Sequence, residues 1–186
     1  MADLTKTRMT AAEFAQLDET SLPMELIHGE VFVSPAPKDP HQDCVLLLGS
    51  WFLREVVPHF PGSAVKIAPL DVYFDDENVL QPDVFWIHGA ESRCKLGDDG
   101  YWHGAPDLVV EVLSEGTRKH DKKTKFELYE RHGVREYWIV DPVDLLVEVF
   151  TLAGGRYQLF GVYDISETFT SPLLGLSVEL KTVLAK

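Results

Sequence analysis

The sequence predicts an α/β (α+β) fold in which helices flank a mixed β-sheet. Between residues 41 and 140, helical and strand patterns follow in the order helix, three strands, helix, strand. Successive strands usually pair as antiparallel neighbours, whereas a strand that follows a crossover helix lies parallel to its neighbour. A chain of 186 residues suits one domain. We therefore expect a single domain over 1–186, with a core of about 10–142 and a C-terminal hairpin extension over 143–186.

The N-terminal part of the chain predicts a short helix and a hairpin. Thr10 and Glu13 fit the capping-box pattern, so a helix should begin after Thr10 and reach Leu17. Two apolar segments within 24–33 flank a turn that contains Gly29. This pattern predicts a β-hairpin with a two-residue turn.

The first core helix and three core strands follow. Apolar residues recur every three or four positions over 41–57, which predicts an amphipathic helix that ends before Pro58. Residues 64–74 alternate in polarity and residues 84–87 are short and apolar, so both predict strands. The run over 108–113 is rich in β-branched residues, as in a strand buried on both faces.

The rest of the chain completes the core and extends it. Residues 89–104 are acidic and contain glycine, which predicts a loop. Residues 117–132 predict a helix that ends at Gly133, and residues 136–140 predict the strand after it. Two segments within 145–162 predict a hairpin, followed by a short terminal strand.

Acidity dominates the composition. Seventeen Lys and Arg against thirty Asp and Glu give a net charge of -13, with a pI near 4.8, which argues against tight non-specific binding to nucleic acid or to an anionic membrane. The N-terminus lacks the apolar run of a signal peptide, and no stretch is long enough to span a membrane, so we expect a cytoplasmic protein. Cys44 and Cys94 lack C-x-x-C spacing and predict neither a zinc site nor a disulfide.

Glu111 is the most unusual residue of the sequence. It lies in an otherwise apolar strand, where an ionised carboxylate without a partner is costly to bury. Asp83 stands at the start of the preceding strand. If these strands pair, both acids reach one end of the sheet, and their repulsion favours a cation such as Mg²⁺ or Mn²⁺ between them. A turn residue after Pro82 is the alternative interpretation of Asp83.

A third group comes from the second core helix. Asp121, Lys125 and Tyr129 are spaced by four and therefore lie on one stripe of this helix. The helix begins soon after the Glu111 strand ends, so Lys125 can reach the carboxylates, position a water and offset charge during phosphoryl transfer. A solvated lysine on the helix surface is the alternative.

Several of these segments carry a resemblance to a known family. They are Glu25–Glu30, Gln81–Asp83, Asp107–Ser114, Asp121 with Lys125 and Tyr129, and Gly133–Pro142. Together, over about residues 10–141, they resemble the Uma family of restriction-endonuclease-like bacterial proteins, a domain of unknown function, and with it the PD-(D/E)XK nuclease superfamily. The resemblance implies a restriction-endonuclease-like core.

The resemblance also implies a Mg²⁺-dependent phosphodiesterase site with Asp83 and Glu111 as metal ligands. The superfamily pattern places a lysine two residues after the second acid, where this chain has Leu113. In the Uma-like pattern a helix lysine substitutes, which implies Lys125 as the third catalytic residue.

Two further residues are accessory contributors by the same analogy. Related nucleases add an acid or amide from the N-terminal region, which implies Glu25 and Gln42 here, beside Asp121 and Tyr129 of the helix. A hairpin surface position for Glu25 and a polar position at a helix N-terminus for Gln42 are simpler interpretations. The histidines show no ligand spacing and are expected at the surface or in hydrogen bonds.

Three functions remain open at this point. The first is a Mg²⁺- or Mn²⁺-dependent endonuclease that cleaves DNA, with weak substrate affinity and as a homodimer or higher oligomer. The second is a non-catalytic nuclease-fold protein that acts through protein partners or self-association. The third is a glycosidase that uses Asp83 and Glu111 as an acid and base pair. Residues 114–135 carry seven basic and four acidic side chains, which fit either a phosphate track or a solvated helix face.

Overall fold

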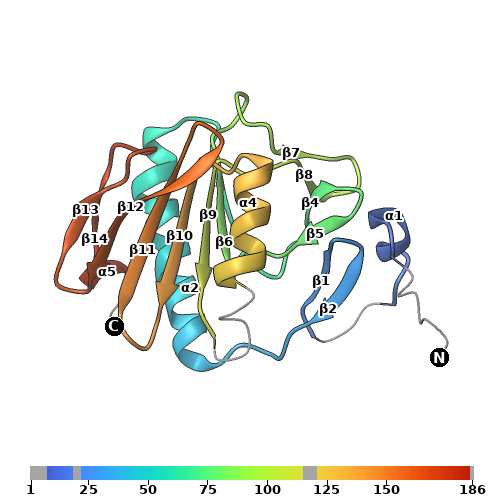
Figure 1. The fold of residues 1–186 in the computed structure, drawn as a ribbon. Helices are drawn as coiled ribbons and strands as arrows, with labels where there is room; N and C mark the ends of the chain where they lie inside the picture. The colour runs from blue at the N-terminus through green and yellow to red at the C-terminus, as the bar shows by residue number, and fades with distance from the viewer. Residues whose placement is uncertain (1–7, 19–21, 115–120, 185–186) are drawn as a thin grey trace.

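The computed structural model describes residues 8–18, 22–114 and 121–184. Six strands form the main sheet, in the order β12-β11-β10-β9-β6-β3. Their bounds are Ala64–Ile67 (β3), Val84–Ile87 (β6), Leu108–Val112 (β9), Glu136–Asp141 (β10), Leu146–Ala153 (β11) and Arg156–Asp164 (β12). Figure 1 shows this sheet between helices α2 (Asp39–Trp51) and α4 (Phe126–His132), which cover opposite faces.

The predicted core order is confirmed. Along the chain, α2 precedes β3, β6 and β9, and α4 stands between β9 and β10. β3 pairs antiparallel with β6 and β6 pairs antiparallel with β9, whereas β10 joins β9 in parallel. The parallel pair arises because the chain crosses over one face of the sheet through α4 before it forms β10.

Alternate residues of β9 pack in two different apolar clusters. Val110 belongs to the cluster beneath α2, whereas Val109 and Leu113 belong to the cluster beneath α4. Side chains two positions apart lie on the same side of a strand, so Glu111 faces α4 as Val109 and Leu113 do. Burial on both faces explains the dense β-branched sequence of this strand.

A second sheet of six short strands lies beside the main sheet, in the order β2-β1-β5-β4-β8-β7 (Figure 1). Its strands are Met24–Ile27 (β1), Glu30–Val33 (β2), Val72–Asp75 (β4), Asn78–Leu80 (β5), Lys95–Leu96 (β7) and Trp102–His103 (β8). β1 and β2 form the predicted hairpin, and its turn residues His28 and Gly29 have φ values of 51° and 74°. Ile27 packs in the cluster beneath α4, which joins the two sheets.

Two predictions for this region are wrong. The segment 64–74 is not one strand, because β3 and β4 belong to different sheets. Between them lies Pro69, which has no N–H to donate to a neighbouring strand and so interrupts regular strand structure. The predicted loop over 89–104 contains β7 and β8, of two residues each. Strands this short show no detectable alternation of apolar and polar residues, and β5 was not predicted for the same reason.

The first helix, α1 (Ala11–Phe14), has the predicted capping box. The Thr10 N–H donates to the Glu13 carboxylate at 2.8 Å, and the Glu13 N–H donates to Thr10 Oγ1 at 3.3 Å. The helix ends at Phe14, before the predicted Leu17.

The first core helix is longer and less regular than predicted. α2 continues into a π-helical turn, η1 (Phe52–Val56), and then into a 3-10 turn, η2 (Val57–His59). Pro58 lies within η2 rather than after the end of the helix. The first positions of a helical turn need no intrahelical N–H partner, so proline is tolerated there.

The second core helix begins, among the described residues, with the π-helical turn η3 (Asp121–Lys125), which leads into α4. Gly133 ends the helix as predicted, with a φ of 85° and its N–H donating to the Tyr129 carbonyl at 3.1 Å. The predicted helical start over 117–120 lies outside the described residues.

The C-terminal part adds a hairpin and a small pair of strands. β11 and β12 form the predicted hairpin, with a bulge at Phe160 of β12. The predicted terminal strand is instead a pair, β13 (Thr168–Thr170) and β14 (Ser177–Glu179), followed by helix α5 (Leu180–Leu184). Over the described ranges, no helix has both the length and the apolar character needed to cross a membrane.

Candidate active site

Asp83 and Glu111 meet where β6 and β9 pair. Val84 lies opposite Val110 in this antiparallel ladder, so the residue before Val84 stands opposite the residue after Val110. Asp83 is held to β9 by its Oδ2 atom, which accepts the Val112 N–H at 2.7 Å. The strand pairing on which the sequence argument depended is therefore present.

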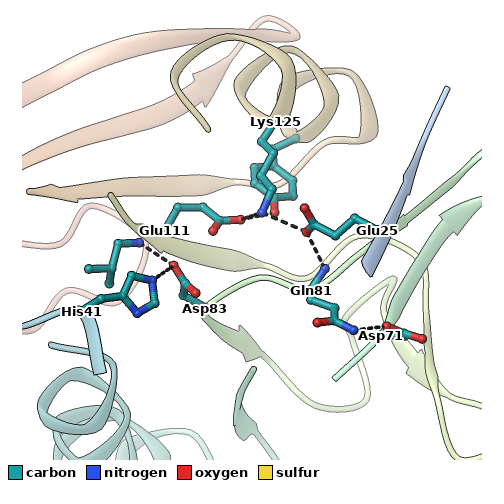
Figure 2. Close-up of polar contacts among 9 residues, drawn as sticks. Glu25, His41, Asp71, Gln81, Asp83, Glu111 and Lys125 are labelled. Atoms are coloured by element: carbon teal, nitrogen blue, oxygen red, sulfur yellow. Dashed lines mark hydrogen bonds and ion pairs between the residues drawn. The ribbon is translucent and has the colours of Figure 1, made fainter. Parts of the chain in front are cut away.

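Lys125 approaches Glu111 from the helix above it (Figure 2), and Tyr129 of the same helix contacts the same carboxylate. Lys125 Nζ donates to Glu111 Oε1 at 3.1 Å, and Tyr129 Oη donates to the same oxygen at 2.5 Å. All three side chains are buried, with Glu111 only 2% exposed. The i, i+4 spacing of the helix residues, read from the sequence, brings both donors to one carboxylate, and the solvated-lysine interpretation is wrong.

Glu25 reaches the same lysine from the second sheet. Its Oε1 atom lies 2.9 Å from Lys125 Nζ and accepts the Gln81 N–H at 2.8 Å. The interpretation of Glu25 as a hairpin surface residue is wrong, because the carboxylate is buried between the sheets. Lys125 thus joins a carboxylate of β9 to a carboxylate of β1, as Figure 2 shows.

Burial sets the protonation of Tyr129. Removal from water raises its pKa well above the usual value near 10, and the neighbouring carboxylates of Glu111 and Glu25 raise it further. The hydroxyl therefore stays protonated and acts as a hydrogen-bond donor. At the edge of the cluster, burial also raises the pKa of Asp71, although the Gln81 amide donates to this carboxylate at 2.7 Å and opposes the shift.

His41 is a member of the cluster that sequence reasoning missed. Its Nε2 atom lies 3.1 Å from Asp83 Oδ2, and both side chains are largely buried. The residue lies in the first turn of α2, which starts at Asp39 within the proline-rich segment 34–40, and the docking of α2 on the sheet brings that turn to Asp83. One feature of the sequence could have indicated His41 as a site residue, namely the polar pair of His41 and Gln42 at a predicted helix start.

These side chains line one cavity of about 380 Å³. Its polar lining consists of Glu25, His41, Gln81, Asp83, Glu111 and Lys125, and the rest of the lining is rich in proline. Gln42 also lines the cavity but is itself exposed, as expected of a polar residue at a helix N-terminus. The backbone of Asp121 belongs to η3, and its side chain lies outside the part of the chain that can be described.

The predicted resemblance can be tested by comparison with known proteins. A family model described as Uma2, "Putative restriction endonuclease", matches residues 11–182. The chain belongs to the Uma2 family. The match continues through β13 and β14, beyond the segment near residue 141 where the sequence resemblance ended.

A solved structure supports the fold of this Uma2-family chain. The chain is similar to a protein from Anabaena variabilis ATCC 29413 that is described as a putative nuclease belonging to DUF820. The TM-score is 0.76 and the sequence identity is 22%, and the match covers 95% of this chain and 97% of that chain. No match was found among curated proteins. At this identity the likeness confirms the predicted mixed α/β fold.

The Uma2 resemblance implies a divalent metal, and the donor set fits one of the magnesium type. Among the described residues, no three His, Cys, Asp or Glu side chains gather as a metal-binding group. Mg²⁺ is commonly held by one or two protein carboxylates together with water, and Asp83 and Glu111 are two carboxylates that line one cavity. Binding of a divalent ion by these two residues stays a prediction.

The described basic residues of the 114–135 segment differ in their surroundings. Lys125 is buried in the cluster, Arg131 lies 3.5 Å from Asp75, and Arg135 lies 3.6 Å from Asp107. Lys123 is exposed. Arg118, Lys119 and the Lys122 side chain lie outside the described residues, so the phosphate track stays a prediction.

Proposed function

We propose that this Uma2-family chain is a nuclease that hydrolyses phosphodiester bonds of DNA with Mg²⁺ or Mn²⁺. The observation that supports the proposal is the convergence of Asp83, Glu111 and Lys125 in one cavity. Two carboxylates are suited to hold a divalent ion, and an ammonium is suited to offset negative charge in phosphoryl transfer.

Each residue has a distinct role in this proposal. Asp83 and Glu111 would hold the divalent ion, which would supply Lewis acidity and lower the pKa of a bound water. The Lys125 ammonium donates a hydrogen bond to the attacking water and offsets negative charge at the phosphate. Tyr129 fixes the Glu111 carboxylate through Oε1, and Val112 fixes the Asp83 carboxylate through its N–H.

Glu25 keeps Lys125 in place for this role. A lysine between two carboxylates has little freedom to leave the cavity, since its ammonium has a partner in each sheet. Preorganisation of this kind lowers the cost of orienting a water in the transition state.

The test is a cleavage assay on several DNA forms. Supercoiled plasmid, linear duplex and single-stranded oligonucleotides are incubated with Mg²⁺, Mn²⁺ or EDTA. We expect cleavage that requires the ion and is lost in Asp83→Asn, Glu111→Gln and Lys125→Met. Loss in EDTA also separates the nuclease from the glycosidase interpretation, which needs no metal.

Asp107→Asn is the matched control. Asp107 is a buried aspartate of the same strand pair that accepts the His88 N–H at 2.9 Å, much as Asp83 accepts the Val112 N–H. Its variant should cleave like the wild type. Failure of the wild type to cleave every DNA form with both ions, or equal cleavage by Asp83→Asn, would overturn the proposal and favour the non-catalytic alternative.

A further inference from the structure

The lining of the candidate active-site cavity is divided by depth. Glu111 and Lys125 are buried, at 2% and 5% exposure, whereas Pro35, Ala36 and Pro37 line the same cavity and are exposed. These three residues belong to the chain segment that runs from β2 of the second sheet to α2 beside the main sheet (Figure 1). The candidate catalytic groups therefore lie at the base of the cavity, and the 35–37 segment lies at its mouth.

The lining at the mouth is apolar. Besides the 35–37 segment, Pro23 and Pro69 contribute to it. Proline lacks the backbone N–H that could bind an anion, and its side chain carries no charge. Enzymes that bind a nucleobase outside the double helix pack its face against apolar or aromatic side chains. The mouth of the cavity therefore suits a base better than it suits a phosphate.

The size of the cavity limits what can enter it. Its volume of about 380 Å³ is that of a site for one small ligand, with room for roughly one nucleotide. A phosphodiester that reaches Lys125 brings its sugar and base into the space beside the 35–37 segment. In a double helix that base is paired and stacked, so the strand has to unpair first, at a cost in free energy. A single strand avoids this cost.

The charges of the cavity also fit a single strand. Lys125 is the one Lys or Arg among the described cavity residues, and Glu25, Asp83 and Glu111 are acidic. Proteins that bind duplex DNA through its backbone place Lys and Arg at several phosphates, and the number of these contacts sets how steeply affinity falls with salt. Single strands are bound in part through the open faces of their bases, which an apolar lining can supply.

We propose that the cavity takes single-stranded DNA, with one phosphodiester beside Lys125 and the adjacent base against the 35–37 segment. The substrate then includes the unpaired part of a partly duplex molecule and excludes an intact double helix. The inference rests on the proposed nuclease function, because the same cavity contains the candidate reaction centre. It goes further by naming the form of DNA that the site accepts.

The first test measures binding without cleavage. A short fluorescent single strand and a blunt hairpin duplex of the same sequence are titrated by anisotropy, with Ca²⁺ as the oxygen-ligated ion. We expect the single strand to bind at least about tenfold more tightly. Its affinity should fall with salt with a slope of about −0.7 for each phosphate contact, for one or two contacts. Equal or tighter binding of the hairpin, no binding of the single strand, or a slope steeper than about −3 would overturn the proposal.

The second test separates base contacts from phosphate contacts. An abasic strand of the same length keeps every phosphate, and we expect it to bind about tenfold more weakly. Ala36→Glu should weaken binding of the normal strand by a similar factor, because it places a carboxylate at the mouth.

Ala90→Glu is the matched control for this variant. Ala90 is exposed between β6 and β7 and is not among the cavity residues, so its variant should bind within about twofold of the wild type. Equal binding of the normal and abasic strands, or equal binding by the two variants, would contradict the base contact at the 35–37 segment.

The third test maps cleavage with Mg²⁺ on a duplex that has a central unpaired loop and on the same duplex fully paired. We expect cuts within the loop and at least about tenfold slower cleavage of the paired form. Equal rates would overturn this inference and leave the nuclease function in place. No cleavage of either form would count against the nuclease function, whereas the binding measurements decide the preference for a single strand.

Discussion

Lys125 Nζ lies 3.1 Å from Glu111 Oε1, although fourteen positions separate the two residues in the chain. The contact forms because β9 turns Glu111 toward the face that α4 covers, and the η3 turn carries Lys125 at the start of that helix. The superfamily position for a lysine, two residues after the acid, is held by Leu113, which packs in the apolar cluster beneath α4.

Loss of the lysine charge should destabilise the fold. In Lys125→Met, the Glu25 and Glu111 carboxylates lose their shared partner in a buried site, and we expect a loss of about 3 kcal/mol in the free energy of unfolding. Urea denaturation measures it. Lys123→Met, at an exposed position in the same turn, should change stability by no more than about 0.5 kcal/mol. Equal stability of the two variants would contradict the role of the buried pair.

Removal of the tyrosine hydroxyl should affect the site more than the fold. Tyr129→Phe deletes a hydrogen bond to an ionised carboxylate, which costs about 1.5 kcal/mol of stability, and should lower cleavage because Glu111 loses an orienting contact. Tyr157→Phe deletes a bond to the Val134 carbonyl and serves as the control, with a cost of about 1 kcal/mol and unchanged cleavage. Equal cleavage by both variants would count against an orienting role for Tyr129.

His41 should influence metal binding through Asp83. His41→Ala removes the contact to Asp83 Oδ2, and loss of a group that orients a ligand weakens metal affinity by about ten- to a hundredfold. Isothermal titration with Mn²⁺ measures this without any substrate. His41→Gln, which keeps an N–H donor, should retain more affinity, and His59→Ala, an exposed histidine away from the cavity, should bind as the wild type does. Unchanged affinity in His41→Ala would refute this role.

His132 should make stability depend on pH. Burial lowers its pKa below 6.5 in the folded state, although Asp75 at 3.1 Å opposes the shift. The unfolded chain therefore binds more protons below pH 6.5, and stability falls as the pH drops from 6.5 toward the folded pKa. His132→Asn should lose less stability between pH 7.5 and 5.5 than the wild type, measured by urea denaturation at each pH. A parallel loss in both proteins would disprove this assignment.

Local patterns in the sequence predicted the part of the site that lies on long elements. The β-branched run around Glu111 and the four-residue spacing of Lys125 and Tyr129 are features of single elements, and the structure brings them together as predicted. The contacts of Glu25 and His41 were not predictable in this way. They depend on how β1 and α2 pack against the main sheet, which no short segment encodes.

The second sheet was the least predictable part of the fold. Its strands are two to four residues long, and their partners come from distant parts of the chain, such as Leu26 opposite Val79. Segments of this length carry no periodicity, so tertiary packing rather than local propensity decides that they are strands. The hairpin of β1 and β2 is the exception, because the requirement of its turn for positive φ is visible in the sequence.

The bridge that Lys125 makes between Glu25 and Glu111 has a consequence for how this family is interpreted. The same three side chains connect the two sheets and belong to the candidate active site. Selection for a stable protein and selection for cleavage therefore act on the same residues. A relative that has lost its activity will tend to keep them, so their presence in a sequence identifies the architecture, and only a biochemical measurement identifies a working enzyme.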